Sequence, residues 1–206
     1  MAFPTVNAPY GFKPINRQDG LPYAGATTQY GIASTVATAI YNGDLVYITG
    51  GTIAKSGVTS NAISTANLTA GVFMGCQYVN TQGQTVQAQY YPGNAAASSA
   101  IAYVVVDANA AFKVAVTNGS GAVSSTTVKA IGVNLAVDQT TAGSTTTGDS
   151  GEGVTAPTAG AGNAVTLPVK VISVVPETAV NATNFSEVVV VLNNPQITRT
   201  AGNDFA

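Results

Sequence analysis

Short runs of alternating apolar and polar residues, separated by turn dipeptides, recur along the chain from about residue 27. A period of two places successive side chains on opposite faces of a β-strand, so each run predicts a strand. The predicted strands span residues 45–49, 52–54, 72–79, 85–91, 112–116, 131–137, 169–175 and 188–192. Asn-Gly, Gln-Gly and Gly-Gly pairs predict the turns between them, and Gly50-Gly51 predicts a two-residue hairpin loop.

The runs 169–175 and 188–192 are continuous β-branched stretches, so we expect both of their faces to be covered. No stretch combines a 3.6-residue apolar period with capping residues, and the Ala-rich residues 94–102 are the one candidate for a helical turn or two. The pattern therefore predicts an all-β fold, an antiparallel sandwich or barrel. We expect residues 26–206 to form it as a single β domain.

The first 25 residues show little alternation and contain four prolines. Proline fixes φ and lacks a backbone N–H, so this density favours an extended N-terminal arm over residues 1–25. Its aromatic side chains should be buried either on the same domain or on a neighbouring subunit, and the sequence leaves both open. The candidate contact residues are Phe3, Pro4, Pro9, Tyr10, Phe12, Pro14 and Tyr23.

Residues 139–164 consist mostly of Thr, Gly, Ala and Ser, a composition that predicts a long exposed loop. Within it, the run Gly148-Asp149-Ser150-Gly151 copies the tetrapeptide around the nucleophile of trypsin-like serine proteases. That chemistry requires a histidine to accept the serine proton. The chain has no histidine, so we interpret the match as coincidence.

Charged residues make up 8% of the chain, against roughly 25% in an average soluble domain, and the net charge is −2. Lys and Arg occur singly, without the cluster that would neutralise phosphates, so we expect no direct nucleic-acid binding. So little charge gives weak repulsion between copies and favours association. We see neither a signal peptide nor an apolar run of about 20 residues, so we expect synthesis in the cytoplasm and no membrane span.

The residue types that carry most enzyme and metal chemistry are missing or scattered. The single cysteine, Cys76, lies in an apolar run, so we expect it to be buried, and a thiolate zinc site is excluded. A remote carboxylate pair such as Asp107 and Glu187, or a calcium site at Asp149 and Glu152, remains open without a supporting motif. We expect no enzymatic activity, no cofactor and no metal.

Four segments in order carry a family resemblance. They are Asn-Ala-Pro-Tyr-Gly-Phe-Lys-Pro at residues 7–14, Tyr-Asn-Gly-Asp-Leu-Val at 41–46, Ala-Gly-Val-Phe-Met-Gly-Cys at 70–76 and Ala-Phe-Lys-Val-Ala-Val at 111–116. Together they resemble the small structural proteins encoded beside the major capsid protein in tailed bacteriophages, the capsid decoration or cement proteins. The resemblance runs from residue 7 to about residue 193.

The resemblance implies a β-rich virion protein, commonly a homotrimer, on the outer surface of an icosahedral HK97-type capsid. Its partner would be the major capsid protein, and it would stabilise the shell by bridging neighbouring capsomers. The candidate contact residues of the arm would then touch a second subunit or the capsid.

Two other functions stay open at this stage. A tail-tube or head–tail connector subunit would also be a self-assembling β protein of this size. A surface adhesin or carbohydrate-binding module is the alternative of another class. It is less favoured because the chain has no Trp and its nine Tyr residues are scattered.

Overall fold

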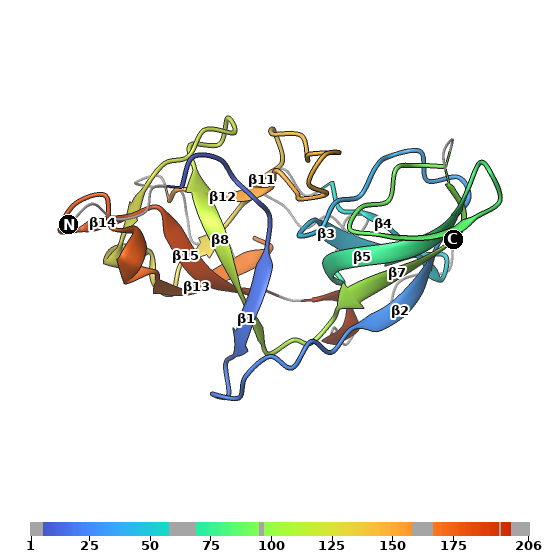
Figure 1. Cartoon of the computed structure of the whole chain (residues 1–206). Helices are drawn as coiled ribbons and strands as arrows, with labels where there is room; N and C mark the ends of the chain where they lie inside the picture. Colours follow the sequence, from blue (N-terminus) through green and yellow to red (C-terminus); the bar gives the residue numbers. More distant parts are fainter. Residues whose placement is uncertain (1–5, 58–68, 95–96, 158–166, 194, 199–206) are drawn as a thin grey trace.

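The computed structural model describes residues 6–57, 69–94, 97–157, 167–193 and 195–198 (Figure 1). These residues form two β-barrels that lie side by side, which confirms the predicted all-β class. The helical elements within the described residues are three short 3₁₀ turns, η1 (Val128–Ala130), η2 (Pro176–Thr178) and η3 (Gln196–Thr198). The predicted sandwich or barrel takes the form of two barrel-like sheets.

The first barrel is built from six strands. They are β2 (Thr28–Ile32), β3 (Leu45–Thr49), β4 (Thr52–Lys55), β5 (Gly71–Asn80), β6 (Thr85–Ala88) and β7 (Ala97–Val105). Pairing runs β3–β4–β2–β7–β5 and returns from β5 to β3, which closes a ring of five strands. The pair β2–β4 is parallel and the other pairs are antiparallel. β6 extends the sheet beyond β5 as its free edge.

The turn chemistry explains the hairpins of this barrel. Gly50 and Gly51 have φ of 53° and 79° and connect β3 to β4, as the Gly-Gly pair predicts. The expectation of a helical turn within residues 94–102 is wrong from Ala97 onward, because these residues open β7. Alternate side chains of β7 enter the core there, with Ala97, Ala100 and Ala102 buried, so burial outweighs the local helix preference of alanine.

The second barrel is built from the following strands: β1 (Lys13–Arg17), β8 (Ala110–Thr117), β10 (Asn134–Leu135), β11 (Val137–Asp138), β12 (Gly153–Thr155), β13 (Val169–Val174) and β15 (Glu187–Leu192). The sheet order is β10–β13–β15–β8–β12–β11, and β1 pairs with β8 beside it. The β8–β12 pair is parallel and the others are antiparallel. A separate two-stranded sheet joins β9 (Thr126–Thr127) to β14 (Asn184–Phe185).

The two ends of this second sheet belong to one continuous segment. β10 and β11 are separated by a single residue, so residues 134–138 pair with β13 on one side and with β12 on the other. The barrel is nearly closed as a result. The predicted strand at 131–137 is therefore correct only in its second half, where Leu135 and Val137 are buried, because residues 131–133 lie outside any strand and Ile131 is 48% exposed.

The expected two-sided covering is confirmed for β15 and not for β13. In β15 every residue except Val189 is buried, because β15 lies between β13 and β8 at the centre of the sheet. In β13 buried and exposed residues alternate, with Lys170 facing solvent. One face of β13 is therefore open.

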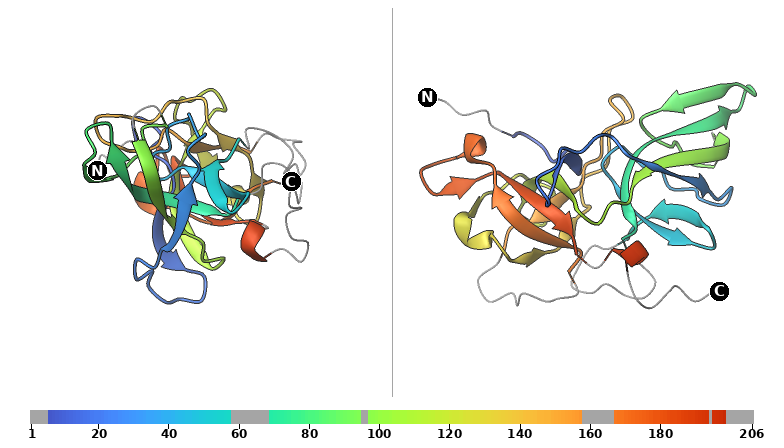
Figure 2. Two further views of the ribbon diagram at one scale, coloured as in Figure 1. Left: turned by 90° about the vertical axis from the view of Figure 1, so that its right-hand side faces the viewer. Right: turned by 90° about the horizontal axis from the view of Figure 1, so that it is seen from below.

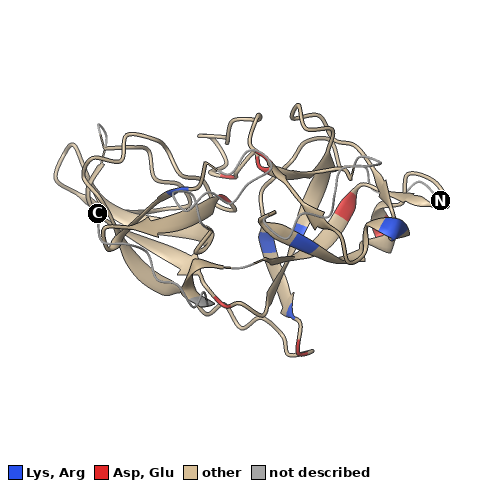
Figure 3. Cartoon of the chain, turned by 180° about the vertical axis from the view of Figure 1, so that it is seen from behind, with Lys and Arg blue, Asp and Glu red and all other residues tan. Residues whose placement is uncertain are grey.

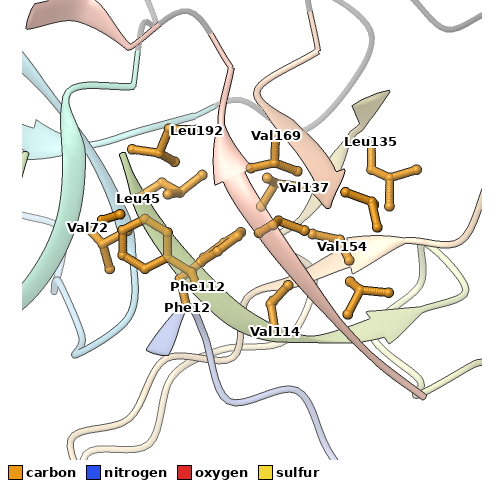
Figure 4. Close-up of a cluster of buried hydrophobic side chains, with 14 of the residues drawn as sticks. Phe12, Leu45, Val72, Phe112, Val114, Leu135, Val137, Val154, Val169 and Leu192 are labelled. Carbon is orange, nitrogen blue, oxygen red and sulfur yellow. The ribbon is translucent and has the colours of Figure 1, made fainter. Parts of the chain in front are cut away.

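Each barrel has its own hydrophobic core. The two barrels lie side by side (Figure 2), and we call the region of contact between them the seam. Leu45, Val72 and Val105 come from the first barrel but pack in the core of the second. Figure 4 shows Leu45 and Val72 beside Phe12 and Phe112. The two barrels are thus joined by apolar packing as well as by the segments of chain that run between them.

The N-terminal segment does not stand apart from the barrels. Residues 13–17 form β1 and pair with the central strand β8, and Phe12 is fully buried. Residues 9–17 of the predicted extended arm therefore lie against the second barrel of the same chain, and Pro14 is accommodated because β1 is an edge strand. Residues 1–5 lie outside the described part.

The predicted exposed loop is also only partly correct. Residues 144–147 are exposed, but Gly148 and residues 150–154 are buried, and β12 lies within this stretch. Small residues allow this burial, because they let the backbone pass between the two barrels. Residues 158–164 of the predicted loop lie outside the described part.

Candidate interaction surface

Two of the predicted contact residues near the N-terminus, Pro9 and Phe12, are buried inside the chain. Phe12 packs edge-to-face on Phe112, with ring centroids 6.5 Å apart, and Pro9 is buried. Phe3 and Pro4 lie outside the described residues. For Pro9 and Phe12, the structure shows the first of the two options that the sequence leaves open, burial on the same chain.

Tyr10, Pro14 and Tyr23 are half-buried and keep part of their surface accessible. The Tyr23 hydroxyl donates a hydrogen bond to the Ala26 carbonyl at 2.8 Å. These three are the described members of the predicted contact set that a partner protein could touch. Tyr10 and Tyr23 have different partners, because the Tyr10 hydroxyl donates to Glu187 and the Tyr23 hydroxyl donates to Ala26.

Tyr10 is held by an acidic side chain of the central strand β15. Its hydroxyl donates to the Glu187 carboxylate, and Lys113 lies 5.8 Å above the Tyr10 ring and 3.4 Å from Glu187. Burial, followed by the hydrogen bond and the negative charge of Glu187, raises the pKa of Tyr10 far above its ordinary value. The hydroxyl therefore stays protonated and acts as a fixed donor.

The first barrel carries almost no charge. Between residues 26 and 106 the charged residues are Asp44 and Lys55 alone. Asp44 is fully buried, and the Lys55 side chain is 21% exposed. Figure 3 shows the charged residues concentrated at the seam and on the second barrel. The outer surface of the first barrel is therefore a neutral surface of Thr, Ser, Gln, Asn and Tyr.

The free edge of this neutral surface is β6. Thr85 and Gln87 are exposed, and Val86 and Ala88 are half-buried. An unpaired strand edge is ordinarily protected by charge or proline. The other sheet follows that rule, because its edge strand β1 contains Lys13, Pro14 and Arg17. β6 contains neither proline nor charge and is accessible to another strand.

A shallow hollow of about 300 Å³ lies beside β6 and includes Cys76 in its lining. Cys76 is 1% exposed, which confirms the predicted burial. Burial raises the pKa of its thiol to about 12, so the nucleophilic thiolate is not formed at neutral pH.

An apolar region lies at the far end of the second barrel, around the β9–β14 sheet. Val128, Ile131 and Val180 are 55%, 48% and 64% exposed. Hollows of about 300 and 320 Å³ flank this sheet, one lined by Val128 and Phe185 and the other by Val180. Exposed apolar groups beside hollows are typical of surfaces that another protein covers.

The seam between the barrels contains a buried ionic cluster. Lys55 Nζ lies 2.9 Å from Asp44 Oδ2 and 3.4 Å from Glu152 Oε1. Glu152 also accepts hydrogen bonds from the Leu45 amide at 3.0 Å and from Gln139 Nε2 at 2.6 Å. Burial, together with the charge of Asp44, raises the pKa of Glu152 to about 8 despite the opposing charge of Lys55.

Sequence reasoning missed this cluster, although part of the signal was present. Asp44 and Lys55 have opposite charges in a long stretch without any other charge, which predicts that they pair. Glu152 could not be assigned to them, because it lies almost 100 residues further along the chain, in a segment expected to be exposed.

The remaining candidate groups have other partners. Ser150 is buried and donates to Asp44 Oδ1 at 2.6 Å, so the protease-like tetrapeptide is part of the seam. Asp107 pairs with Arg17, whereas Glu187 contacts Tyr10 and Lys113, so these two acids are engaged at different places.

The suggested calcium site is likewise divided between two lysines. Asp149 contacts Lys13 at 2.7 Å, and Glu152 faces Lys55. Each acid thus has a cation beside it, which opposes a second cation. Within the described residues no group of three or more His, Cys, Asp or Glu side chains could hold a metal ion. The same residues contain no helix long and apolar enough to cross a membrane.

No protein-family model, curated protein or solved structure matches this chain.

Proposed function

We propose that the chain is a virion structural protein that decorates an icosahedral HK97-type capsid and stabilises it by bridging neighbouring capsomers. The observation that supports this most is the neutral surface of the first barrel. A surface with no charge outside the seam offers little repulsion to another protein and leaves few ions to desolvate when it is covered.

The free edge β6 gives this surface a means of attachment. Strand addition to an edge supplies backbone hydrogen bonds, and the side chains on either face then determine which partner is accepted. We propose that the first barrel faces the major capsid protein and that the apolar region around β9–β14 is used between subunits of a homotrimer. Many weak identical contacts sum to strong binding on a lattice.

The experiment is binding of the purified chain to expanded shells of its parent phage that lack it, followed by electron cryomicroscopy. We expect added density on the outer surface between capsomers. Rings or stacked tubes of the purified chain would instead indicate a tail-tube or connector subunit. Light scattering after size exclusion should give the mass of a trimer.

The double substitution Thr85→Glu with Gln87→Glu tests the face that binds. It places two negative charges on β6, and we expect it to abolish shell binding without changing the fold. The matched control, Ser120→Glu with Ser173→Glu, adds the same charge at exposed positions of the second barrel, in the turn after β8 and on β13. Equal binding of the two variants would contradict the assignment of the first barrel.

Deletion of the N-terminal segment is not a clean test of contact. Removal of residues 2–23 would also remove β1 and the buried Phe12 ring. Loss of binding would then report unfolding. Substitution of the half-buried Tyr23 by Ala tests the arm instead, because its ring is not in the centre of either core.

A further inference from the structure

Asp44, Lys55 and Glu152 bring an amine and two carboxyl groups together at the seam. Asp44 and Glu152 are both fully buried, and the Lys55 amine lies within 3.4 Å of a carboxylate oxygen of each. Asp44 immediately precedes β3, and Lys55 ends β4, so they belong to the two ends of one hairpin. Glu152 comes from the second barrel and closes the group.

The carboxyl group of Asp44 is held at both oxygens. The Ser150 hydroxyl donates to Oδ1 at 2.6 Å, and the Tyr41 amide donates to Oδ2 at 2.8 Å. The two donors hold the carboxyl group in place, with Oδ2 2.9 Å from the Lys55 amine. They would also stabilise the negative charge that forms on oxygen when a nucleophile adds to that carbon.

We propose that Lys55 and Asp44 form an intramolecular amide bond, an isopeptide cross-link, and that Glu152 transfers the protons. This inference goes beyond the proposed function and does not depend on it, because it concerns the chemistry of the chain itself.

The reaction balances without an external reagent. The Lys55 ammonium first gives a proton to the Asp44 carboxylate across the 2.9 Å contact, which produces a neutral amine and a neutral acid. The amine nitrogen then bonds to Asp44 Cγ. The protonated Glu152 carboxyl donates a proton to the departing hydroxyl and receives one from the attacking nitrogen. The products are the amide and one water molecule, and Glu152 ends in its initial state.

The surroundings favour this reaction over a stable ion pair. Burial disfavours charge, so conversion of two ions into one neutral amide relieves a desolvation cost. Burial also raises the pKa of Glu152 to about 8, so its carboxyl carries a proton to donate at neutral pH. Burial lowers the pKa of Lys55, but the two acids outweigh it and hold that pKa above its usual value. The free amine therefore arises by transfer to Asp44.

Two other lysines of the chain provide the contrast. Lys13 is even closer to its acid, 2.7 Å from Asp149, but the two side chains are 29% and 42% exposed. Lys113 lies 3.4 Å from Glu187 and is 38% exposed. Within the described part of the chain, neither lysine contacts a second carboxylate. Water solvates these pairs and no group shuttles the proton, so we expect them to remain ionic.

Intact-mass spectrometry of the full purified chain tests the proposal. We expect a mass lower than that of the sequence by one water molecule, and the same result after denaturation. A chain at the full sequence mass would overturn the proposal.

Peptide mapping then locates the lost water. Trypsin does not cleave after an acylated lysine, so the cross-linked chain should yield residues 18–113 as one peptide, less one water. The uncross-linked chain yields 18–55 and 56–113. A dehydrated 18–55 peptide would indicate a cyclic imide at an aspartate, and it would also overturn the proposal.

Two substitutions separate the roles. Lys55→Arg keeps the positive charge but cannot form the amide, so we expect the full mass. Glu152→Gln keeps the size and loses the transferable proton, so we expect the full mass in a chain with an unchanged circular dichroism spectrum. Complete water loss in Glu152→Gln would overturn the role of Glu152. Lys13→Arg is the matched control and should still lose water.

Discussion

The two barrels are close in architecture and opposite in electrostatics. The first is closed and the second nearly closed, and each surrounds a hydrophobic core, but the first has only Asp44 and Lys55 as charged residues, and both lie at the seam. The second carries Lys13, Arg17 and Lys170 among others on its outer face. A β-barrel therefore needs little charge to fold. The distribution of charge instead separates a surface suited to water from one suited to another protein.

The largest expected effect tests whether the barrels are independent. Phe12→Ala removes a buried ring from the second core and should lower the free energy of unfolding by about 3–5 kcal/mol. Phe73→Ala is the matched change in the first core. Because Leu45, Val72 and Val105 join the cores, we expect one urea transition for both variants, as for a single domain. Two separate transitions would show that each barrel unfolds alone.

The second effect tests the backbone contact at the seam. Gly43 has φ of 97°, and an added Cβ would lie 2.9 Å from the Phe12 nitrogen. Gly43→Ala should therefore cost more than the roughly 1–2 kcal/mol of a left-handed alanine. Gly83→Ala, at φ of 79° in open space, bears the conformational cost alone and serves as control. Equal urea midpoints for the two variants would argue against a tight seam.

The third effect concerns the charge at the seam. The pKa of Glu152 is raised from 4.5 to about 8, so the folded state retains a proton that the unfolded state has lost. Stability should therefore fall as the pH rises from about 4.5 to about 8. This direction holds whether or not Lys55 and Asp44 are cross-linked, because burial is the main cause. Urea unfolding at pH 5 and pH 8.5 measures it.

Glu152→Gln should flatten this dependence, and the exposed Glu177→Gln should leave it intact. The slope is the measurement here, because the amide side chain also changes hydrogen bonds at the seam. An unchanged slope in Glu152→Gln would assign the pH dependence to another group.

The smallest effect tests the surface charge of the second barrel. Lys13→Met removes an ion pair with Asp149 that is partly exposed, and such pairs contribute about 0–1 kcal/mol. We expect a urea midpoint close to that of the unmodified chain, in contrast to the seam variants. A loss as large as that of Phe12→Ala would mean that the pair is structural.

Local sequence patterns predicted most of the strands correctly. They failed where contacts between residues far apart in the sequence determine the local structure or its burial. Alternation and Gly-Gly located β3 and β4, because strand period and turn chemistry are properties of neighbouring residues. Residues 97–102 read as helical because alanine has high helix propensity, and core burial reversed that preference. Residues 150–154 were predicted to be exposed and are buried. Small residues occur both in exposed loops and in buried close contacts, so their composition does not predict that two barrels enclose them.

The candidate site divides in the same way. The sequence shows that residues 26–106 contain only two charged residues, Asp44 and Lys55. It does not show that these residues close into one barrel with a neutral outer surface. Phe12 was a candidate contact residue whose burial on the same domain or on a neighbour was left open, because its partner, Phe112, lies 100 positions later. No local rule connects residues at that separation.

The order of the strands has a consequence for synthesis on the ribosome. β2 to β7 are contiguous, so the first barrel has all its strands once residue 105 has emerged. β1 is made before them, but its partner β8 follows them, with Lys13 opposite Lys113. At roughly 5–20 residues per second, β1 waits several seconds or more for β8. The apolar residues beside β1 are unprotected during this interval, so a nascent chain is most exposed to chaperones and to misassembly at its N-terminal end.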